Sequence, residues 1–359
     1  MLRIKDIKIK KDFSKEELIK YICEKSKIKL TDVRDFRIYK KSIDARNKED
    51  IFYVYTVDIL VEDEKLYKKF EHIDLEDEAK IDVKVNRKSL LRPIVVGAGP
   101  AGLFAALTFA QNGVKPIILE QGKCVDERQK DVELFWKKGK LNTLSNVQFG
   151  EGGAGTFSDG KLTTGVNDPL CKKVIREFYN FGAPEQILYT SKPHIGTDNL
   201  INIVRNMREE IKRLGGDVYF NEQVVDFKIE ENKIKAVICK SGKVFETDAV
   251  VLAIGHSARA TFEKLYSKGI NMEKKNFSVG VRIEHKQEMI NKSQYGDKTK
   301  LKLPPAEYKL AYHGKDRSCY TFCMCPGGVV VASSSEDGTI VTNGMSKFAR
   351  NGENANSAV

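Results

Sequence analysis

The chain has 359 residues, of which 41% are hydrophobic and 31% charged, and its net charge is +11. This length allows two or three domains with cores of their own. The sequence contains no apolar run near the roughly 20 residues that a membrane-spanning helix needs, and it begins without the apolar segment of a signal peptide. Seven cysteines at irregular spacing, without a CxxC pair, indicate free thiols in a reducing compartment. We therefore expect a cytoplasmic protein with no membrane partner.

The excess of positive charge is spread along the chain among acidic residues. Basic runs such as 8–11 and Lys40-Lys41 are short, which is typical of solvated faces rather than of phosphate-binding patches. We expect no nucleic-acid partner.

Residues 1–88 have the pattern of a separate α+β domain. Residues 2–9 alternate apolar and polar side chains, and Ser14 and Glu17 resemble a capping box that opens a helix through about Lys25. Further elements are strands at 36–41 and 52–61, a second helix at about 64–72 and a last strand at about 79–85. This βαββαβ order predicts a ferredoxin-like domain, followed by a linker at 86–89.

A glycine motif follows the linker. The apolar strand 94–96 ends at Gly97, and Gly99 and Gly102 complete a G-x-G-x-x-G pattern at the start of a helix over about 100–111. In a dinucleotide-binding fold the first glycine makes the tight turn, and the second admits the pyrophosphate to backbone N–H groups. The third lets helix and strand pack closely.

An acidic residue stands where this motif requires one. The apolar strand at 114–119 ends at Glu120, which is 23 positions after Gly97. A carboxylate about 20 residues beyond the glycines accepts hydrogen bonds from the adenosine ribose and repels the 2′-phosphate of NADP. Strand, glycines, helix, strand and acid in this order predict a dinucleotide site.

The parallel pattern changes after Glu120. We expect helices at 127–139 and 197–214, a β-meander at 223–230, 233–239 and 243–247, and an apolar strand that ends at Ala253-Ile254-Gly255. This order is typical of flavoproteins with two dinucleotide folds, in which the second strand and its glycine pass close to the cofactor.

A second G-x-G-x-x-G match spans 150–155, but it neither follows a buried strand nor precedes an amphipathic helix. It is therefore not a second dinucleotide motif. We expect a loop that lines the reactive face of a flavin, with Ser158, Asp159 and Lys161 at its tip, and an ordinary surface loop is the alternative.

Several blocks resemble a known family. They comprise 148–162, 192–198, 255–259, 280–285 and 320–328, and the similarity extends over essentially all of residues 1–359. The sequence resembles a largely uncharacterised bacterial family of predicted FAD-dependent dehydrogenases that carry an additional N-terminal domain. The resemblance implies an oxidoreductase that binds FAD, and it names no substrate. The expected cofactor contacts are Gly97, Ala98, Gly99, Pro100, Ala101, Gly102, Glu120, Gln121, Arg128, Gly153, Gly155, Val225, Ala253 and Gly255.

The expected architecture is α/β, with three parts. The N-terminal domain is followed by an FAD-binding Rossmann-type domain at 89–260, which contains a glycine-rich insertion at about 121–196. A substrate or cap region at 261–359 comes last. Flavoproteins of this class place a Gly-Asp element near their C-terminus. No suitable pair occurs before Val359, so we expect a shortened cap region and part of the flavin-binding surface to be missing.

Catalytic residues stay unassigned, because no nucleophile–base pair is evident. His194, His256 and His285 lie in polar, glycine-adjacent settings and are expected to be structural. Cys319, Cys323 and Cys325 do not match the usual redox or metal-binding spacings, so we expect core thiols and no metal.

These patterns predict hydride transfer between FAD and an unknown small-molecule substrate, with NAD(P)H as a transient reductant. Two alternatives stay open. One is a flavin-carrying binding protein associated with RNA modification, and the other is an inactive fragment of a flavoprotein.

Overall fold

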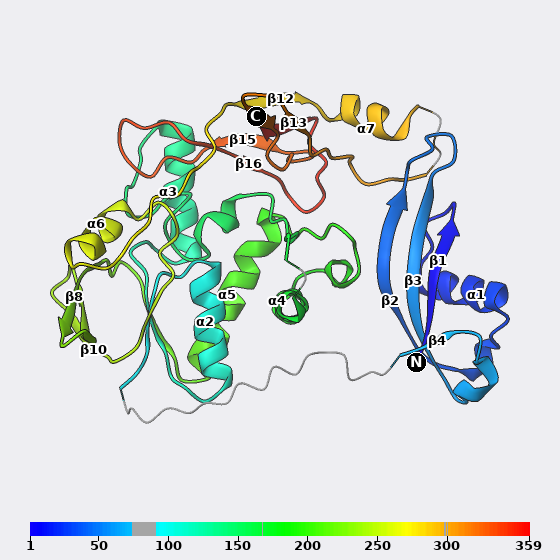
Figure 1. Cartoon of the computed structure of the whole chain (residues 1–359), viewed down its shortest axis with the longest axis horizontal. Coiled ribbons are helices and arrows are strands. Elements are labelled where there is room, and N and C mark those ends of the chain that lie inside the picture. Colours follow the sequence, from blue (N-terminus) through cyan, green and yellow to red (C-terminus); the bar gives the residue numbers. More distant parts are fainter. Residues whose placement is uncertain (74–90, 167, 298, 300) are drawn as a thin grey trace.

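The computed structural model describes residues 1–73, 91–166, 168–297, 299 and 301–359. An N-terminal unit lies at one end of the molecule, and the nucleotide-binding part and a C-terminal region form the rest (Figure 1). Among the helices of these residues, none is both long enough and apolar enough to cross a membrane.

The described residues of the N-terminal unit form a four-stranded antiparallel sheet covered by one α-helix. Its strands have the spatial order β2-β3-β1-β4. Leu2, Leu18, Ile22 and Ile59 are among the side chains of its core. The elements are β1 (Leu2–Ile9), α1 (Lys15–Ser26), η1 (Leu30–Asp32), β2 (Val33–Asp44), β3 (Phe52–Val61), η2 (Glu64–Tyr67) and β4 (Glu71–His72).

This unit agrees only in part with the expected ferredoxin-like domain. The capping box is present, because Ser14 Oγ accepts from the N–H of Glu17 and the Glu17 carboxylate accepts from the N–H of Ser14. The predicted second helix is wrong: η2 is a single 3₁₀ turn, since residues 71–72 must pair with β1 immediately afterwards. The predicted strand at 79–85 and the linker lie outside the described residues, so the ferredoxin-like assignment stays a prediction.

The nucleotide-binding part is built on a parallel sheet with the order β11-β5-β6-β7. Its strands are β5 (Ile94–Val96), β6 (Ile117–Leu119), β7 (Asp217–Tyr219) and β11 (Val250–Leu252). Helices α2 (Pro100–Gln111) and α5 (Thr197–Arg213) pack on one face through Val95 and Ile118. The opposite side chains, including Ile94 and Leu119, pack against the meander. Because both faces are covered, β5 and β6 are apolar at every position.

The meander is the antiparallel sheet β10-β9-β8, as predicted. It consists of β8 (Val224–Glu230), β9 (Lys233–Cys239) and β10 (Val244–Glu246), and α6 (Arg259–Ser267) follows β11. The segment between β6 and α5 contains α3 (Val125–Lys138), η4 (Gly153–Phe157), α4 (Pro169–Asn180) and η5 (Glu185–Leu188). Helix α4 was not predicted, although Asp168 caps its first turn.

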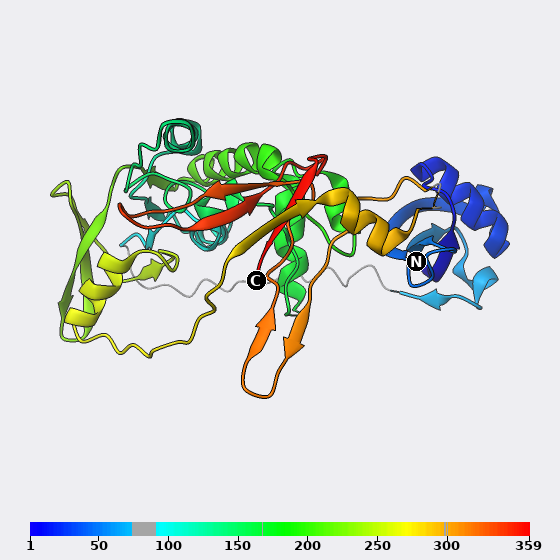
Figure 2. The same ribbon diagram turned by 90° about the horizontal axis from the view of Figure 1, so that it is seen from above.

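The C-terminal region contains three two-stranded sheets, β12-β17, β13-β14 and β15-β16. Its elements are β12 (Arg282–Lys286), α7 (Gln287–Tyr295), β13 (Ala311–His313), β14 (Ser318–Tyr320), β15 (Val329–Ala332), β16 (Thr342–Met345) and β17 (Asn354–Ala358). The β13–β14 hairpin projects away from the other elements (Figure 2). In Figure 1 strands β15 and β16 lie above α5, and the N–H of Thr197 at the start of α5 donates to the carbonyl of Ser346 at 3.1 Å, so this region covers one side of the nucleotide-binding part.

Candidate cofactor site

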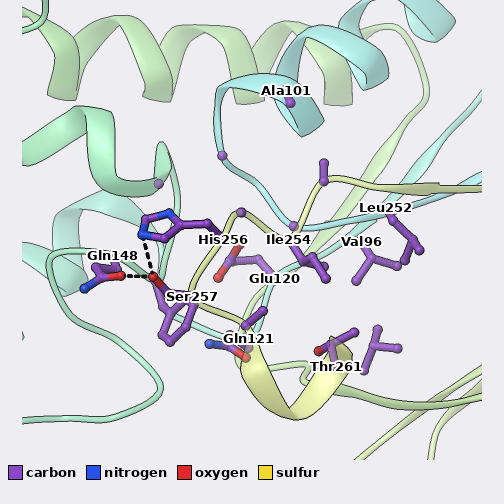
Figure 3. A pocket seen from close by; sticks show the side chains of 18 of the residues that line it. Val96, Ala101, Glu120, Gln121, Gln148, Leu252, Ile254, His256, Ser257 and Thr261 are labelled. Carbon is purple, nitrogen blue, oxygen red and sulfur yellow. Dashed lines mark hydrogen bonds between the residues drawn. The ribbon is translucent and has the colours of Figure 1, made fainter. Parts of the chain in front are cut away.

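A cavity of about 520 Å³ opens where the parallel strands β5, β6 and β11 end (Figure 3). Gly97 follows β5, Glu120 follows β6 and Ala253 follows β11, and all three residues line the cavity. The chain runs from β5 to β6 and β7 on one side, and after the meander it returns to β11 on the other side of β5. Such a switch point at the carboxyl ends of parallel strands is the usual ligand site of an open α/β sheet.

The three motif glycines meet three different steric conditions. Gly97 has φ of +100°, and a Cβ there would lie 2.4 Å from the carbonyl oxygen of Ala253. A Cβ on Gly102 would lie 1.9 Å from the carbonyl oxygen of Gly97, so helix α2 can pack this closely only with glycine. Gly99 lines the cavity, and its Cβ would meet nothing nearer than the Cα of Gly153, at 3.9 Å. The absence of a side chain at Gly99 therefore leaves space for a ligand, whereas at Gly97 and Gly102 it avoids clashes within the protein.

Helix α2 begins at this opening with donors available to an anion. Gly99 is the N-cap residue and has no side chain with which to cap the helix, and Pro100 has no N–H. The N–H groups of Ala101 and Gly102 in the first turn are therefore available to a ligand, and the positive end of the helix dipole lies beside them. This is the arrangement that binds phosphate groups.

Glu120 joins the two glycine-rich segments. Its buried carboxylate accepts hydrogen bonds from the N–H of Ala98 at 2.7 Å, of Gly122 at 2.9 Å and of Gly150 at 3.0 Å. A carboxylate has about four lone-pair positions, so one of them is left for a ligand hydroxyl.

The second glycine-rich segment is packed against the first. Gly152 donates its N–H to the carbonyl of Ala98 at 2.8 Å. A Cβ on Gly153 would lie 3.1 Å from the Cα of Gly99. The segment continues into η4, a 3₁₀ helix, and is not the turn of a second strand–helix unit. It forms one wall of the cavity.

Arg128 of α3 holds this wall in shape from behind. Its guanidinium is fully buried, and its N–H groups donate to the carbonyl oxygens of Asn146, Val147, Gly150, Glu151 and Gly153. Burial lowers the pKa of Arg128 to about 10, so it stays protonated at neutral pH. Arg128 does not line the cavity, which corrects the expected direct contact: its donors are committed to the loop.

Glu151 is a buried carboxylate on the far side of the same loop. One oxygen accepts from the N–H of Val125 at 2.7 Å and from Arg208 at 2.6 Å, whereas the other has no hydrogen-bond partner among the described residues. Burial raises the pKa of Glu151 to about 7, against the opposing effects of the Val125 N–H and of Arg208.

Three polar side chains form a hydrogen-bonded row on another wall of the cavity. Gln148 Nε2 donates to the carbonyl of Ser333 at 2.5 Å, and Gln148 Oε1 accepts from Ser257 Oγ. Ser257 Oγ also lies 3.2 Å from Nε2 of His256 (Figure 3).

The comparisons identify the cofactor of the chain. A family model described as FAD binding domain matches 92–154, and one described as flavin containing amine oxidoreductase matches 144–303. A model described as FAD-dependent protein, C-terminal domain-like, matches 276–359, and a domain of unknown function matches 1–60. An uncharacterized protein of Clostridium beijerinckii is 48% identical over 366 residues, covering 100% of this chain and 68% of that protein.

The chain belongs to the family of FAD-dependent oxidoreductases that its motifs resemble. Its cofactor is FAD.

Solved structures show only distant similarity to this FAD-dependent oxidoreductase. The THI4 protein of Thermovibrio ammonificans is 15% identical, with a TM-score of 0.33 and coverage of 50% of this chain and 64% of that one. L-proline dehydrogenase from P. horikoshii is 17% identical, with a TM-score of 0.29 and coverage of 55% and 59%. Glycine oxidase from Bacillus cereus is 16% identical, with a TM-score of 0.28 and coverage of 50% and 58%. These scores carry no structural argument.

Most of the expected cofactor contacts come together in the cavity, and the remainder lie close behind it. Val225 is replaced by its neighbour Val224, because adjacent strand residues face opposite sides. Ala98, Gly102 and Arg128 shape the walls without lining them. The residues that line the cavity as expected are Gly97, Gly99, Pro100, Ala101, Glu120, Gln121, Gly153, Gly155, Ala253 and Gly255.

Sequence reasoning missed a second group of lining residues. Thr261, Phe262 and Leu265 reach the cavity from α6, whose place depends on the chain path after Gly255. Gln148 lies in the resembling block, and that block was the one available signal for it. The group also includes Phe149, Gly150, Glu222, Val224, His256 and Ser257.

The tip of the glycine-rich segment does not line the cavity, contrary to expectation. Asp159 is buried and accepts from Arg350 Nη2 at 2.5 Å and from Ser346. Lys161 lies 3.6 Å from a carboxylate oxygen of Glu307. These pairs join the segment to the C-terminal region, since their charges neutralise one another on burial.

The other candidate histidines and cysteines lie elsewhere. His194 Nε2 is hydrogen-bonded to the carbonyl of Phe348 at 2.8 Å, and His285 is bonded to Tyr308 outside the cavity. Cys325 is buried, but Cys319 and Cys323 are exposed, so the expectation of core thiols is wrong for these two. Both exposed thiols lie in or just after the projecting hairpin. The described residues contain no cluster of potential metal ligands.

Proposed function

We propose that this oxidoreductase transfers hydride between FAD, bound with its pyrophosphate at the start of α2, and a small-molecule substrate. We further propose that NAD(P)H binds transiently as reductant. When bound, FAD supplies the two-electron redox chemistry.

One observation carries the placement of the cofactor. Gly99 and Gly153 lie against each other and both line the cavity, which Ala101 of the first turn of α2, Glu120 and Gly255 also line. The first turn of α2 would bind the pyrophosphate, and the remaining acceptor position of Glu120 would receive a ribose hydroxyl. At Gly255, where φ is +70°, a Cβ would meet nothing within 4 Å, so the backbone there is open to the cofactor.

Transient rather than stable binding of NAD(P)H is supported by the sheet topology. Within the described residues, β11-β5-β6-β7 is the only parallel sheet, so they offer one dinucleotide fold, and FAD takes it. An amine is the first substrate class to test, because the flavin containing amine oxidoreductase model spans the glycine-rich segment and the meander.

The cofactor placement is tested by Gly99→Ala. The added methyl group would occupy ligand space without meeting protein atoms, so we expect at least a tenfold weaker FAD affinity, about 1.4 kcal/mol, with an unchanged midpoint of unfolding of the FAD-free protein. FAD binding is followed by quenching of flavin fluorescence.

Two control variants accompany it. Gly165→Ala adds a methyl group in open space and should change neither quantity. Gly102→Ala forces a Cβ against Gly97 and should lower stability itself. Wild-type affinity in Gly99→Ala would contradict the placement.

The reductant and substrate are tested with the FAD-loaded protein under anaerobic conditions. Mixing with NADH or NADPH should bleach the flavin absorbance, and the oxidised (imine) form of the substrate amine should then restore it by accepting hydride from the reduced flavin. No bleaching by NADH and NADPH would contradict the proposed reductant but not the cofactor site.

A further inference from the structure

We propose that His256 presents an unprotonated Nδ1 to the cavity as a hydrogen-bond acceptor for a hydroxyl group of the bound dinucleotide. Its tautomer is set by the row Ser257–Gln148–Ser333. This inference rests on the proposed function, because it takes the cavity to be the FAD site.

The direction of hydrogen-bond donation along the row is determined at Ser333, its inner end. The carbonyl oxygen of Ser333 can only accept, so the amide group bonded to it at 2.5 Å is the Gln148 Nε2 donor. The opposite side of the same amide is therefore the Oε1 acceptor, and it faces Ser257.

Ser257 transmits this direction to the imidazole. Its hydroxyl has one proton, and that proton is donated to Gln148 Oε1. Toward His256 Nε2, at 3.2 Å, the same oxygen can then only accept, so Nε2 carries a proton.

The outer end of the row is a free acceptor. A neutral imidazole with a proton on Nε2 has an unprotonated Nδ1. His256 lines the cavity and is exposed, and in Figure 3 its second ring nitrogen points away from Ser257. A dinucleotide supplies the matching donors, because its sugar and ribityl hydroxyls are the neutral O–H groups that enter such a site.

Other charged groups near the cavity already have partners. Glu120 accepts from three backbone N–H groups, and Glu222 accepts from Lys243 and Ser241. Arg259, two residues beyond Ser257, pairs with Glu336. Among the side chains that line the cavity, Glu120, Glu222 and His256 are the ionisable ones. His256 thus has a ring nitrogen that no described protein group uses.

The tautomer is tested by NMR of the FAD-free full chain with ¹⁵N-labelled histidine, in which His256→Gln identifies the signal among the five histidines. We expect the neutral form to have its proton on Nε2, and Ser257→Ala to mix the two tautomers. Adding FAD should shift the Nδ1 resonance in the direction of an accepted hydrogen bond. A proton on Nδ1 in the neutral wild-type protein would overturn the proposal.

The acceptor role is tested by FAD affinity. His256→Gln removes the acceptor at the Nδ1 position and should weaken FAD binding about three- to tenfold, the range of one hydrogen bond. His256→Asn places an amide oxygen near that position and should recover part of the loss. His285→Gln, outside the cavity, is the matched control and should bind FAD like the wild type.

The outcomes separate the two proposals. Wild-type protein that shows no FAD binding contradicts the proposed function itself. Wild-type protein that binds FAD while His256→Gln binds it equally well overturns only the role of His256. Because the His256 side chain is exposed, the unfolding midpoint of the FAD-free variant should match that of the wild type, which shows that the variant is folded.

Discussion

At the residue scale, two buried carboxylates on the same loop system have different environments. Glu120 is surrounded by three backbone donors, which compensate a negative charge at the cavity wall. Glu151 has one backbone donor and Arg208 on one oxygen, and its other oxygen has no partner in the described part of the chain. Burial without full compensation favours the protonated acid, so Glu151 is the residue through which pH acts on this loop.

The raised pKa of Glu151 predicts a stability that decreases as pH rises. The unfolded chain releases this proton near the usual pKa of 4.5, whereas the folded chain keeps it until about pH 7. The contribution of Glu151 is therefore fully present below the lower value and is lost between the two. Relative to Glu151→Gln, the wild type should lose about 1–3 kcal/mol of unfolding free energy across this window, measured by urea denaturation.

A control variant makes this test specific. Glu209→Gln alters an exposed carboxylate that also bonds Arg208, and this hydrogen bond lowers the pKa of Glu209. Its pH profile should keep the downward slope of the wild type. Parallel profiles for the wild type and Glu151→Gln would show that Glu151 does not retain the proton.

At the scale of elements, α3 organises the glycine-rich wall through one side chain. The loop 146–153 has few side chains of its own to pack, and five of its carbonyls are buried around Arg128. A Cβ on Gly150 would lie 2.4 Å from Cδ of Arg128, so the loop fits closely around the arginine. The shape of the cofactor site thus depends on a residue that does not contact the cavity.

Arg128→Lys should loosen this wall. An ammonium group donates at most three hydrogen bonds and lacks the planar fork, so at least two buried carbonyls lose their donor. We expect the protein to lose about 2–4 kcal/mol of stability, FAD to bind at least tenfold more weakly, and hydrogen exchange to accelerate over 146–157. The N-terminal unit should exchange as before.

Arg205→Lys is the matched control, because Arg205 of α5 pairs at the surface with Asp126 of α3, the helix that carries Arg128. It should change none of the three quantities appreciably. Unchanged exchange over 146–157 in Arg128→Lys would contradict the positioning role.

At the scale of the whole molecule, the N-terminal unit contacts the remainder through the edge of its sheet. Lys41 of β2 donates its N–H to the carbonyl of Tyr189 at 2.7 Å, and its carbonyl accepts from the N–H of Ser191 at 3.0 Å. Tyr53 donates its hydroxyl to the carbonyl of Lys302 at 2.5 Å. Since β2 is an edge strand, its outward backbone groups are available for this contact.

Lys41→Pro should weaken this contact while preserving the N-terminal sheet. Proline is tolerated on an edge strand where its nitrogen faces outward, and it removes the donor to Tyr189. We expect unfolding to separate into two transitions and proteases to cleave between the units more readily. Lys41→Ala keeps the backbone donor and should unfold like the wild type apart from a small loss of side-chain contacts. A single unchanged transition in Lys41→Pro would show that other contacts hold the units together.

Local patterns were sufficient for several elements of both the N-terminal unit and the nucleotide-binding part. The limits of α2 were predicted to the residue, and β1, β3 and β9 agree closely, because hydrophobic period, capping residues and turn glycines act over short distances. The second helix of the N-terminal unit failed because pairing of β4 with β1 overrides local helix preference. For the same reason the tip residues Asp159 and Lys161 could not be placed: their partners Arg350 and Glu307 are distant in the sequence.

The sequence by itself determined the dinucleotide fold, the cofactor class and ten of the residues that line the cavity. It could do so because the glycine spacing and the acidic residue at the end of a strand are local features whose steric and electrostatic roles do not depend on distant segments. Only the tertiary structure decided which residues contact the cavity and which support it. In the folded chain Arg128 donates to the loop carbonyls rather than to a ligand, and Val224 rather than Val225 lines the cavity. The fold also sets the direction of the hydrogen bonds in the row that ends at His256. Those roles depend on which donors and acceptors burial leaves unpaired, and that depends on the packing of segments far apart in the chain.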